Sequence, residues 1–162
     1  MTAEVPVDFT IRQMRPGEEA LIVDITLSVW QDVSVAKRMC DIIGDINGHP
    51  WTDHKADQVL AEMNRSSVIL VGEVSGAIAA FATLIYDAKY ATGTLGHLGV
   101  AAPFQNRGLG RLMIRASLDR MRADGMKIAR IDTLAHNERG CHLYPSEGFR
   151  EVARTVHFFQ TL

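Results

Sequence analysis

The stretch GVAAPFQNRGLGRLMIRASLDRMRADG, from Gly99 to Gly125, decides the fold that this sequence predicts. It predicts a helix from about Arg107 to Ala123, which Asp124 and Gly125 end in the manner of a glycine C-cap. The start of this helix carries arginines and no acidic residue, although the positive amino end of a helix favours carboxylates. A phosphate bound at the helix start would remove this conflict.

The segments on either side of the helix are typical of strands, and together they predict a parallel pair. A strand, a helix and a second strand between Leu95 and Leu134 form a crossover unit, whose two strands lie parallel in one sheet. Upstream, Val68–Tyr86 is a long apolar segment interrupted by Glu73 and by the turn-forming pair Ser75-Gly76, which predicts an antiparallel hairpin. The predicted fold class is therefore α/β (α+β), with a mixed, mostly antiparallel central sheet, one parallel strand pair and helices on both faces.

Other elements follow from the spacing of apolar residues and from glycine and proline breaks. The glycines of the predicted strand Ala91–Ala102 suggest a bulge or a close approach by a ligand. The segment Lys127–Ala135 is predicted to be a buried strand, and Phe149–Leu162 to form one or two closing strands. The remaining predictions are a strand at Phe9–Met14 and helices at Glu18–Trp30, at Ser34–Ile46, from a cap at Thr52 or Asp53 to Asn64, and within Asn137–Phe149, closed by Gly148.

Length and composition fit one soluble domain spanning residues 1–162. Apolar residues make up 47% of the chain and charged residues 22%, and the net charge of −2 argues against nucleic acid or an anionic membrane as a partner. The two cysteines, Cys40 and Cys141, form no metal-ligand spacing and suit free thiols in a reducing compartment. The first residues lack the pattern of a secretory signal, so we expect a cytoplasmic protein.

The loop from Gln105 to Arg111 has the composition of a phosphate-binding loop, but two familiar versions do not fit. A nucleotide-binding P-loop needs a lysine after its last glycine, and this loop has none. A dinucleotide-binding loop needs a third glycine where Met113 stands. Gly108 and Gly110 would still let a ligand approach the unsatisfied N–H groups of the first helical turn, and a pyrophosphate would also neutralise the two arginines of the loop.

The glycine loop and the strand before it resemble the acyl-coenzyme A binding motif of the GNAT family of N-acetyltransferases. In that motif, Gln/Arg-x-x-Gly-x-Gly/Ala follows a strand that ends in an apolar residue, often with a proline in the turn. The matching positions are Val100, Pro103, Gln105, Gly108 and Gly110.

A second match lies downstream in NERGCHLYPSEGF, Asn137 to Phe149, which is similar to the family pattern Asn-x-x-Ala-x-x-Leu-Tyr-x-Lys-x-Gly-Phe. Gly140 replaces the small alanine, Ser146 replaces a common lysine, and Pro145 disfavours an ordinary helix at that point. The matching positions are Asn137, Leu143, Tyr144, Gly148 and Phe149. Motif-level similarity runs from about Leu95 to Phe149, and the order of elements agrees over nearly the whole chain.

The resemblance implies transfer of an acetyl group from acetyl-CoA to a primary amine by direct attack on the thioester, with coenzyme A as product. Backbone N–H groups from Asn106 to Arg111 would hold the pyrophosphate, and the strand Leu98 to Ala101 would hydrogen-bond the pantetheine arm. An N–H group around Leu98 to Val100 would stabilise the developing oxyanion. The expected cofactor-binding residues are Leu98, Val100, Gln105, Asn106, Arg107, Gly108, Leu109, Gly110, Arg111 and Asn137.

Two residues are expected to move protons in this reaction. The resemblance makes Tyr144 the general acid for the leaving thiolate, and Asn137, Gly140 and Tyr144 would share one face of a helix. Many relatives place a carboxylate on the strand before the glycine loop as the base. Here His97 is the only titratable group of that strand and the expected base, with Glu73 and a water chain to solvent as alternatives.

The N-terminal helices and the segment Gly48–His54 are expected to recognise the acceptor, a small-molecule or peptide amine whose identity the motifs do not give. His49, Asp53 and His54 lack a fourth ligand and a regular spacing, so no metal site is expected. The alternatives are a sensor that binds acyl-CoA without turnover, the same enzyme with a different acyl group, and a nucleic-acid-binding module, which the acidic balance opposes. Oligomeric state stays open, although TVHFFQTL, Thr155–Leu162, could pair across a homodimer.

Overall fold

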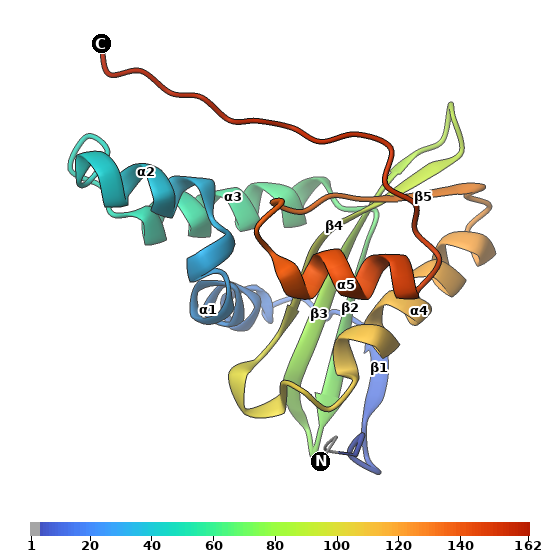
Figure 1. Ribbon diagram of the computed structural model, residues 1–162. Helices are drawn as coiled ribbons and strands as arrows, with labels where there is room; N and C mark the ends of the chain where they lie inside the picture. The colour runs from blue at the N-terminus through green and yellow to red at the C-terminus, as the bar shows by residue number, and fades with distance from the viewer. Residues whose placement is uncertain (1–3) are drawn as a thin grey trace.

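A five-stranded mixed sheet with the strand order β1-β2-β3-β4-β5 forms the centre of the computed structural model, which describes residues 4–162 (Figure 1). Neighbouring strands from β1 to β4 run antiparallel, and β5 runs parallel to β4. This confirms the predicted mixed, mostly antiparallel sheet with one parallel pair. The strands are β1 (Thr10–Gln13), β2 (Val68–Val74), β3 (Ala77–Asp87), β4 (Thr92–Val100) and β5 (Ile128–Ile131).

A two-residue turn joins β2 to β3, as the sequence predicts. Ser75 and Gly76 have positive φ angles of 50° and 80°, a conformation that lets a tight turn follow the right-handed twist of the two strands. The long apolar segment is therefore a hairpin. Within residues 4–162, no helix has the length and apolar character needed to cross a membrane.

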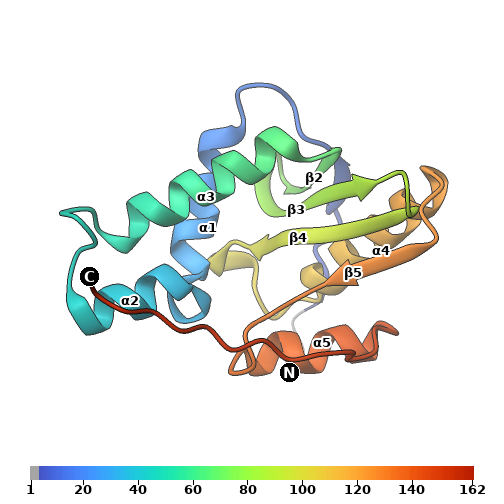
Figure 2. The ribbon, with the colours of Figure 1, turned by 90° about the horizontal axis from the view of Figure 1, so that it is seen from above.

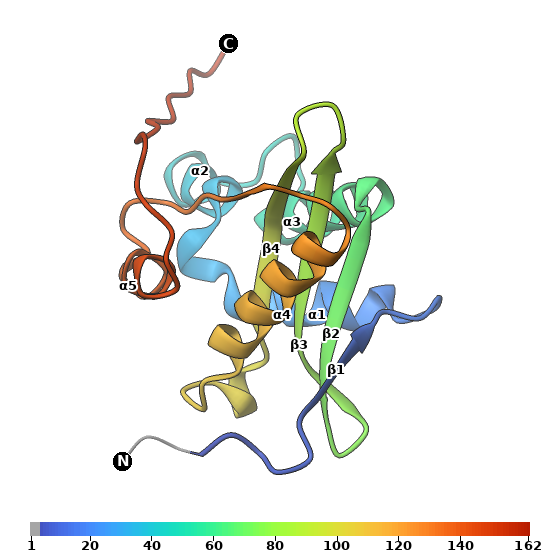
Figure 3. The ribbon, with the colours of Figure 1, turned by 90° about the vertical axis from the view of Figure 1, so that its right-hand side faces the viewer.

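Helices cover both faces of the sheet (Figure 3). The helices α1 (Glu19–Val29) and α3 (Trp51–Arg65) pack against one face, and α2 (Val35–Ile43) packs against α3. On the opposite face lie α4 (Leu109–Ala123) and α5 (Glu138–Ser146), which contribute side chains to the same core. This arrangement confirms the prediction of helices on both faces.

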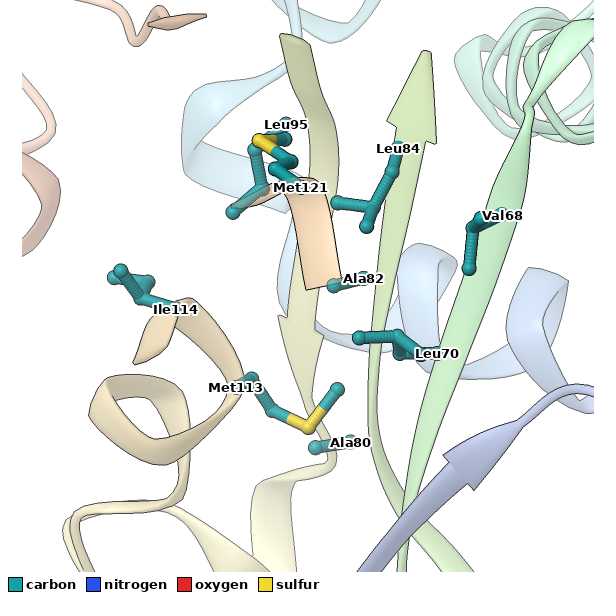
Figure 4. Packing of buried hydrophobic residues seen from close by; sticks show 9 residues of the cluster. All are labelled: Val68, Leu70, Ala80, Ala82, Leu84, Leu95, Met113, Ile114 and Met121. Atoms are coloured by element: carbon teal, nitrogen blue, oxygen red, sulfur yellow. The ribbon is translucent and has the colours of Figure 1, made fainter. Parts of the chain in front are cut away.

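Clusters of buried apolar residues on both faces of the sheet hold these layers together. On the α1 and α3 face, Ile22, Val59 and Phe81 are fully buried. On the α4 face, Met113 and Ile114 pack over strands β2, β3 and β4 (Figure 4). Burying one such side chain contributes about 1.5–3 kcal/mol, so the packing fixes α4 against β4 and with it the loop that joins them. The cluster drawn in Figure 4 comprises Val68, Leu70, Ala80, Ala82, Leu84, Leu95, Met113, Ile114 and Met121.

Glycines set both ends of α4. The helix begins at Leu109, later than the predicted Arg107, because Gly108 is its N-cap and adopts a left-handed φ of 80°. At the other end, Gly125 has a φ of 85°, which confirms the predicted glycine C-cap.

Two boundaries near the amino terminus differ from the prediction. The helix α2 ends at Ile43 because Gly44, with a φ of 79°, follows it. The predicted cap of α3 at Thr52 or Asp53 is wrong, since Pro50 is the N-cap and no side chain caps that helix. The fixed φ of a proline suits a helix start without a side-chain cap.

A bulge interrupts the middle of β4. Two of its residues, Gly96 and His97, lie opposite the single residue Thr83 of β3, because the register shifts between Ala82 and Leu84. The Thr83 hydroxyl accepts a hydrogen bond from the His97 backbone N–H at 2.7 Å. The glycines of this strand predicted such a bulge, and the structure confirms it.

Beyond the bulge, β4 and β5 separate (Figure 2). The parallel pairing covers only Thr92–Leu95 on β4 and Ile128–Ile131 on β5. Within the described part of the chain, the second half of β4, Gly96–Val100, is therefore paired with a strand only on the β3 side. An open strand edge results, directly before the loop that begins α4.

Two predictions for the carboxyl-terminal part are wrong. The strand β5 is not buried, because it is the edge of the sheet and its Ile128 is 55% exposed. The closing strands predicted within Phe149–Leu162 are absent, and all residues from 150 to 162 are exposed (Figure 1). Alternating apolar residues indicate that a segment can pair, but a strand also needs an adjacent edge, and this segment runs away from the sheet.

Candidate active site

The loop between β4 and α4 presents the start of the helix to solvent. A 3₁₀ turn, Ala102–Phe104, leads from β4 into the loop, where Asn106 and Gly108 have φ angles of 61° and 80°. Among residues 4–162, no side chain caps the first turn of α4, and that turn contains no acidic residue. The N–H groups of Leu109–Arg111 are therefore suited to hold an anion.

The predicted cofactor residue Gln105 makes contacts that the sequence did not reveal. Its Nε2 donates a hydrogen bond to the carbonyl oxygen of Val100 at 3.0 Å, and its Oε1 accepts one from Arg139 of α5 at 2.9 Å. The Gln105 side chain thus links the end of β4 to α5. These contacts fix the path of the glycine loop between the two elements.

A carboxylate from the far end of α5 neutralises part of the positive charge on α4. Glu147 forms ion pairs with Arg111 and Arg115, the second at 2.8 Å, and its side chain is only 5% exposed. Hydrogen bonding to Arg115 is the main reason why the pKa of Glu147 lies below its usual value. Sequence reasoning missed this partner because it lies 36 residues from Arg111. By contrast, Arg107 forms no salt bridge within residues 4–162, and its guanidinium lies 5.9 Å from the centroid of the Phe104 ring.

Asn137 caps the helix α5. Its Oδ1 accepts a hydrogen bond from the Gly140 N–H at 3.2 Å, and its Nδ2 donates one to the Thr133 hydroxyl at 2.8 Å. A Cβ atom added to Gly140 would lie 2.8 Å from Asn137 Nδ2 and 3.2 Å from a ring carbon of Tyr144. This confirms that the three residues share one face of the helix, with Gly140 between the other two.

The Tyr144 side chain is half-buried against the α4 core and meets the Phe149 ring edge-on, at a centroid distance of 6.2 Å. Burial, with smaller effects from Asp132 and Cys141, raises the pKa of Tyr144 to about 12. The hydroxyl is thus protonated at neutral pH and can donate a proton. The expectation that Pro145 disfavours helix is wrong, because α5 continues to Ser146 and the proline removes only one N–H from its last turn.

His97 lies in a buried network on the α3 face of the sheet, with only 3% of its surface exposed. Its Nδ1 lies 2.6 Å from Glu62 Oε1, and its Nε2 lies 2.9 Å from the Nζ atom of Lys55. The Thr83 hydroxyl donates a further hydrogen bond to Glu62. Because a carboxylate and an ammonium flank the ring, the Nδ1–H tautomer fits, with Nε2 accepting from Lys55. Both ring nitrogens of His97 are therefore occupied.

Trp30 closes the network from the side of α1. Its ring stacks on the His97 ring at a centroid distance of 4.3 Å, and Lys55 Nζ lies 3.8 Å from the Trp30 ring centroid. Burial lowers the pKa of Lys55 to about 8, against an opposing attraction from Glu62. Burial alone would raise the pKa of Glu62, but hydrogen bonds from His97 and Thr83 hold it below its usual value.

Sequence reasoning missed Lys55 and Glu62, although a signal for them exists. The buried residues of α3 are Lys55, Val59, Glu62 and Met63, at the spacing of one helix face. Charged residues at core-facing positions of an amphipathic helix are rare unless they are paired. Their presence in that stripe could have indicated a buried ionic network.

The other candidates from the sequence are engaged elsewhere or dispersed. Glu73, the alternative base, pairs with Arg12 at 2.6 Å, and hydrogen bonding to Arg12 lowers its pKa. His49 contacts Asp53 at 3.3 Å near the start of α3. Within the part of the chain that the structure describes, no group of three or more His, Cys, Asp or Glu side chains could hold a metal ion.

Comparison with known proteins agrees with this geometry. A model of the acetyltransferase (GNAT) family matches residues 36–149 of the chain. Among curated proteins, no sequence matches significantly.

Several solved structures share the fold at low sequence identity. The ribosomal-protein-S18-alanine N-acetyltransferase from Escherichia coli has a TM-score of 0.68 and 19% identity, over 90% of this chain and 79% of the other. The aminoglycoside N-acetyltransferase AAC(6')-Iy, solved in complex with CoA, has a TM-score of 0.65 and 17% identity, over 95% of each chain. The yncA protein from Salmonella typhimurium, solved with its cofactor acetyl-CoA, has a TM-score of 0.64 and 22% identity, over 87% and 79%.

The Glu147 ion pairs generate a prediction about stability. Replacing Glu147 by glutamine should lower the free energy of unfolding by about 1 kcal/mol near pH 7, because both arginines lose a charged hydrogen-bond partner but stay partly exposed. Urea denaturation measures the change. The matched control is Glu151→Gln, which removes an exposed ion pair with Arg154 and should leave the free energy of unfolding nearly unchanged.

The variant Glu147→Gln also tests the lowered pKa of Glu147. A carboxyl group with a lowered folded-state pKa stabilises the fold above its usual pKa of 4.5, and this stabilisation is lost as the pH falls through the folded-state value. The stability difference between wild type and Glu147→Gln should therefore be constant above about pH 5 and shrink in more acidic solution. A difference that does not depend on pH would contradict this assignment.

Proposed function

Since the chain belongs to the GNAT family of acetyltransferases, we propose that it transfers an acetyl group from acetyl-CoA to a primary amine, with coenzyme A as product. The observation that carries this proposal is the open edge of β4 next to the uncapped start of α4. Similar folds that bind CoA or acetyl-CoA support the cofactor. Two similar proteins are N-acetyltransferases, which supports a nitrogen acceptor.

The residues around the β4 edge suit this cofactor. The N–H groups of the α4 start would bind its pyrophosphate, and Arg107, which has no ion partner in residues 4–162, would add a positive charge. The open edge of β4 from Leu98 to Val100 would hydrogen-bond the amide-rich pantetheine arm as an added strand. The residues proposed to bind the cofactor are Leu98, Val100, Gln105, Asn106, Arg107, Gly108, Leu109, Gly110, Arg111 and Asn137.

Acetyl-CoA supplies an activated thioester, and the chain must stabilise the charge that develops on it. The backbone N–H of His97 already donates a hydrogen bond to the Thr83 hydroxyl. We therefore assign the oxyanion contact to a backbone N–H between Leu98 and Val100. Tyr144 is proposed as the general acid, since its raised pKa keeps the hydroxyl protonated until the thiolate leaves.

The amine must lose a proton before it attacks, and we propose that the Glu62–His97–Lys55 network accepts it as a unit. While Lys55 is an ammonium it donates to His97 Nε2, and the network has no site for another proton. Once Lys55 is neutral, the Lys55 and His97 pair can take up one proton, with Glu62 stabilising the resulting charge. The general base in this proposal is therefore the hydrogen-bonded pair of neutral Lys55 and His97, of which His97 belongs to β4.

The acceptor would approach from the side of α1 and α3. Trp30 lies half-buried at the end of α1 beside the network, and the segment from His49 to His54 opens α3. A small molecule or a peptide terminus is compatible with this arrangement. The alternative function is that of an acyl-CoA sensor, which would bind the cofactor but release no thiol with any amine. Thiol release with a panel of amines and acyl donors separates these alternatives.

Binding of acetyl-CoA is the first test of the proposed site. Acetyl-CoA at 100 times its dissociation constant should stabilise the protein by about 2.7 kcal/mol, measured as a thermal shift against ATP and NADH as controls. The variant Gly108→Val should abolish this shift, because valine strains a backbone with a φ of 80° and blocks the loop. Gly125→Val imposes a similar strain at a φ of 85° at the opposite end of α4 and should retain the shift.

Equal shifts with all three ligands would reduce the loop to a general anion site. Retained acetyl-CoA affinity in Gly108→Val would mean that the cofactor binds elsewhere. If Gly108→Val loses the shift and Gly125→Val retains it, the loss is an effect on binding and not a general loss of stability.

The role of Tyr144 predicts a selective loss of turnover. Replacement by phenylalanine removes the proton donor but keeps the ring packing, so kcat should fall by about 100-fold or more while acetyl-CoA affinity stays nearly unchanged. Tyr86→Phe is the matched control, since the Tyr86 hydroxyl contacts Asp124 at 2.9 Å outside the site. Unchanged kcat in Tyr144→Phe would remove this residue from the acid role.

The proton-accepting network predicts a pH dependence. The value of kcat/KM should rise with pH and level off above about 8, as Lys55 loses its proton. In Lys55→Met the group that titrates is removed, so the rise that ends near pH 8 should disappear. The control Lys37→Met removes an exposed ion pair with Asp41 and should leave the profile unchanged. Superimposable profiles of wild type and Lys55→Met would exclude the network as the base.

A further inference from the structure

Thr83 is a fully buried polar residue in the middle of β3, directly opposite the bulge of β4. Its neighbours in the buried segment Ala79–Leu84 are all apolar. A valine would have nearly the same shape and an equally high β-propensity at this position. Because a buried hydroxyl is costly unless it is hydrogen-bonded, its presence here indicates a polar task that valine cannot perform.

The Thr83 hydroxyl closes a ring of hydrogen bonds that begins and ends in His97. Its oxygen accepts a hydrogen bond from the backbone N–H of His97 at 2.7 Å, and its hydrogen is donated to Oε1 of Glu62. The same carboxylate oxygen lies 2.6 Å from Nδ1 of the His97 ring. The backbone and the imidazole of His97 are therefore held together, through one hydroxyl and one carboxylate.

The backbone part of this ring fixes the register of the strand that follows the bulge. Pairing with β3 resumes after His97, with Leu98 opposite Ala82 and Val100 opposite Ala80. In an antiparallel pair, successive N–H groups point alternately toward and away from the neighbouring strand, and a slip by one residue reverses this order. The bond from His97 to Thr83 thus determines which N–H groups of Leu98–Val100 face the open edge of β4.

The side-chain part of the ring fixes the position of the Glu62 carboxylate. Glu62 is on α3, whereas His97 and Thr83 are on two strands of the sheet. With a hydrogen-bond donor on each strand, Oε1 is held at the bulge and against the Nδ1 side of the imidazole. The opposite ring nitrogen, Nε2, is thereby directed toward Lys55, at 2.9 Å.

We propose that Thr83 is a positioning residue for the acetyl transfer. Its hydroxyl holds the bulge so that a backbone N–H after His97 faces the thioester oxygen, and it holds Glu62 so that His97 and Lys55 are aligned to accept the proton of the amine. Thr83 acts through these groups and does not touch the reactants. The inference rests on the proposed function, because it assigns a further residue to that reaction.

Kinetics of thiol release by Thr83→Val provide the first test. Valine keeps the shape of the side chain and removes the hydroxyl, so kcat should fall by at least about 10-fold, since a displacement of 1 Å in an active site can cost about 100-fold. The thermal shift with acetyl-CoA should stay nearly unchanged, because the glycine loop follows the end of β4, beyond the bulge. Thr83→Ser keeps the hydroxyl and should restore most of the lost kcat.

Thr26→Val is the matched control. Thr26 is also fully buried, but its hydroxyl donates to the carbonyl oxygen of Ile22 in its own helix, at 2.7 Å. Loss of that hydroxyl should leave kcat at the wild-type value. The proposal is overturned by an unchanged kcat in Thr83→Val, by a loss that Thr83→Ser does not restore, or by an equal loss in Thr26→Val.

NMR of the wild-type chain tests the ring without turnover, and it needs no variant that has to fold. The His97 imidazole should carry its proton on Nδ1 at neutral pH, and the His97 amide should exchange slowly with solvent. A proton on Nε2 alone, or a rapidly exchanging amide, would overturn the ring and the positioning role. A wild-type chain with the expected signals that releases no thiol with any amine would overturn the proposed function, and the role of Thr83 in it, while the ring itself stands.

Discussion

The separation of β4 from β5 after Leu95 is the constraint on which the rest of the site depends. It begins at the bulge, where Gly96 and His97 share one position opposite Thr83. Gly96 has to be a glycine in this arrangement, because an added Cβ would collide with the carboxylate of Glu62. The bulge, the open edge and the buried network on α3 are therefore parts of one local structure.

The buried network of Glu62, His97 and Lys55 is not explained by its contribution to stability alone. A buried ion pair is seldom more stable than an apolar cluster of similar volume, whereas removal of one partner typically costs about 3–5 kcal/mol. Lys55 and Glu62 occupy two core-facing positions of α3 where apolar residues would serve the fold as well. Their charges meet at His97, beside the point where β4 opens. This placement supports a role in the reaction at that edge, in addition to packing.

On the other face of the sheet, a carboxylate also pairs with basic residues that are distant in the sequence. Glu147 neutralises Arg111 and Arg115 and holds α5 against α4. The same contact positions Tyr144, which lies one turn earlier on α5, relative to the glycine loop. Arg107 is then the arginine of the loop that has no carboxylate partner in residues 4–162. At the arginine-rich start of α4, Arg111 thus pairs with Glu147, whereas Arg107 stays available for a bound anion.

Local signals in the sequence predicted most of the fold, including the glycine loop that leads from β4 into α4. The Ser75-Gly76 turn, the Gly125 cap and the glycines of β4 each constrain the backbone within a few residues, so their effects can be recognised without knowledge of distant contacts. The partners of charged residues could not be predicted in this way. Glu147 and Glu62 meet their partners across packed elements, so the spacing of α3 could indicate that Glu62 is buried and paired, but it could not identify the partner of either carboxylate.

The two errors near the carboxyl terminus have a common physical origin. The sequence predicted that β5 is buried and that the last residues form strands, and a single chain fulfils neither expectation. Apolar pattern reflects the environment of a segment in its final assembly, whether its neighbours come from the same chain or from another one. Ile128 lies on the edge strand of the sheet, and residues 150–162 have no strand beside them, so both segments lack the neighbour that their apolar pattern predicted. Alternating apolar residues thus indicate that a segment can pair, but they do not say where in space a free strand edge lies.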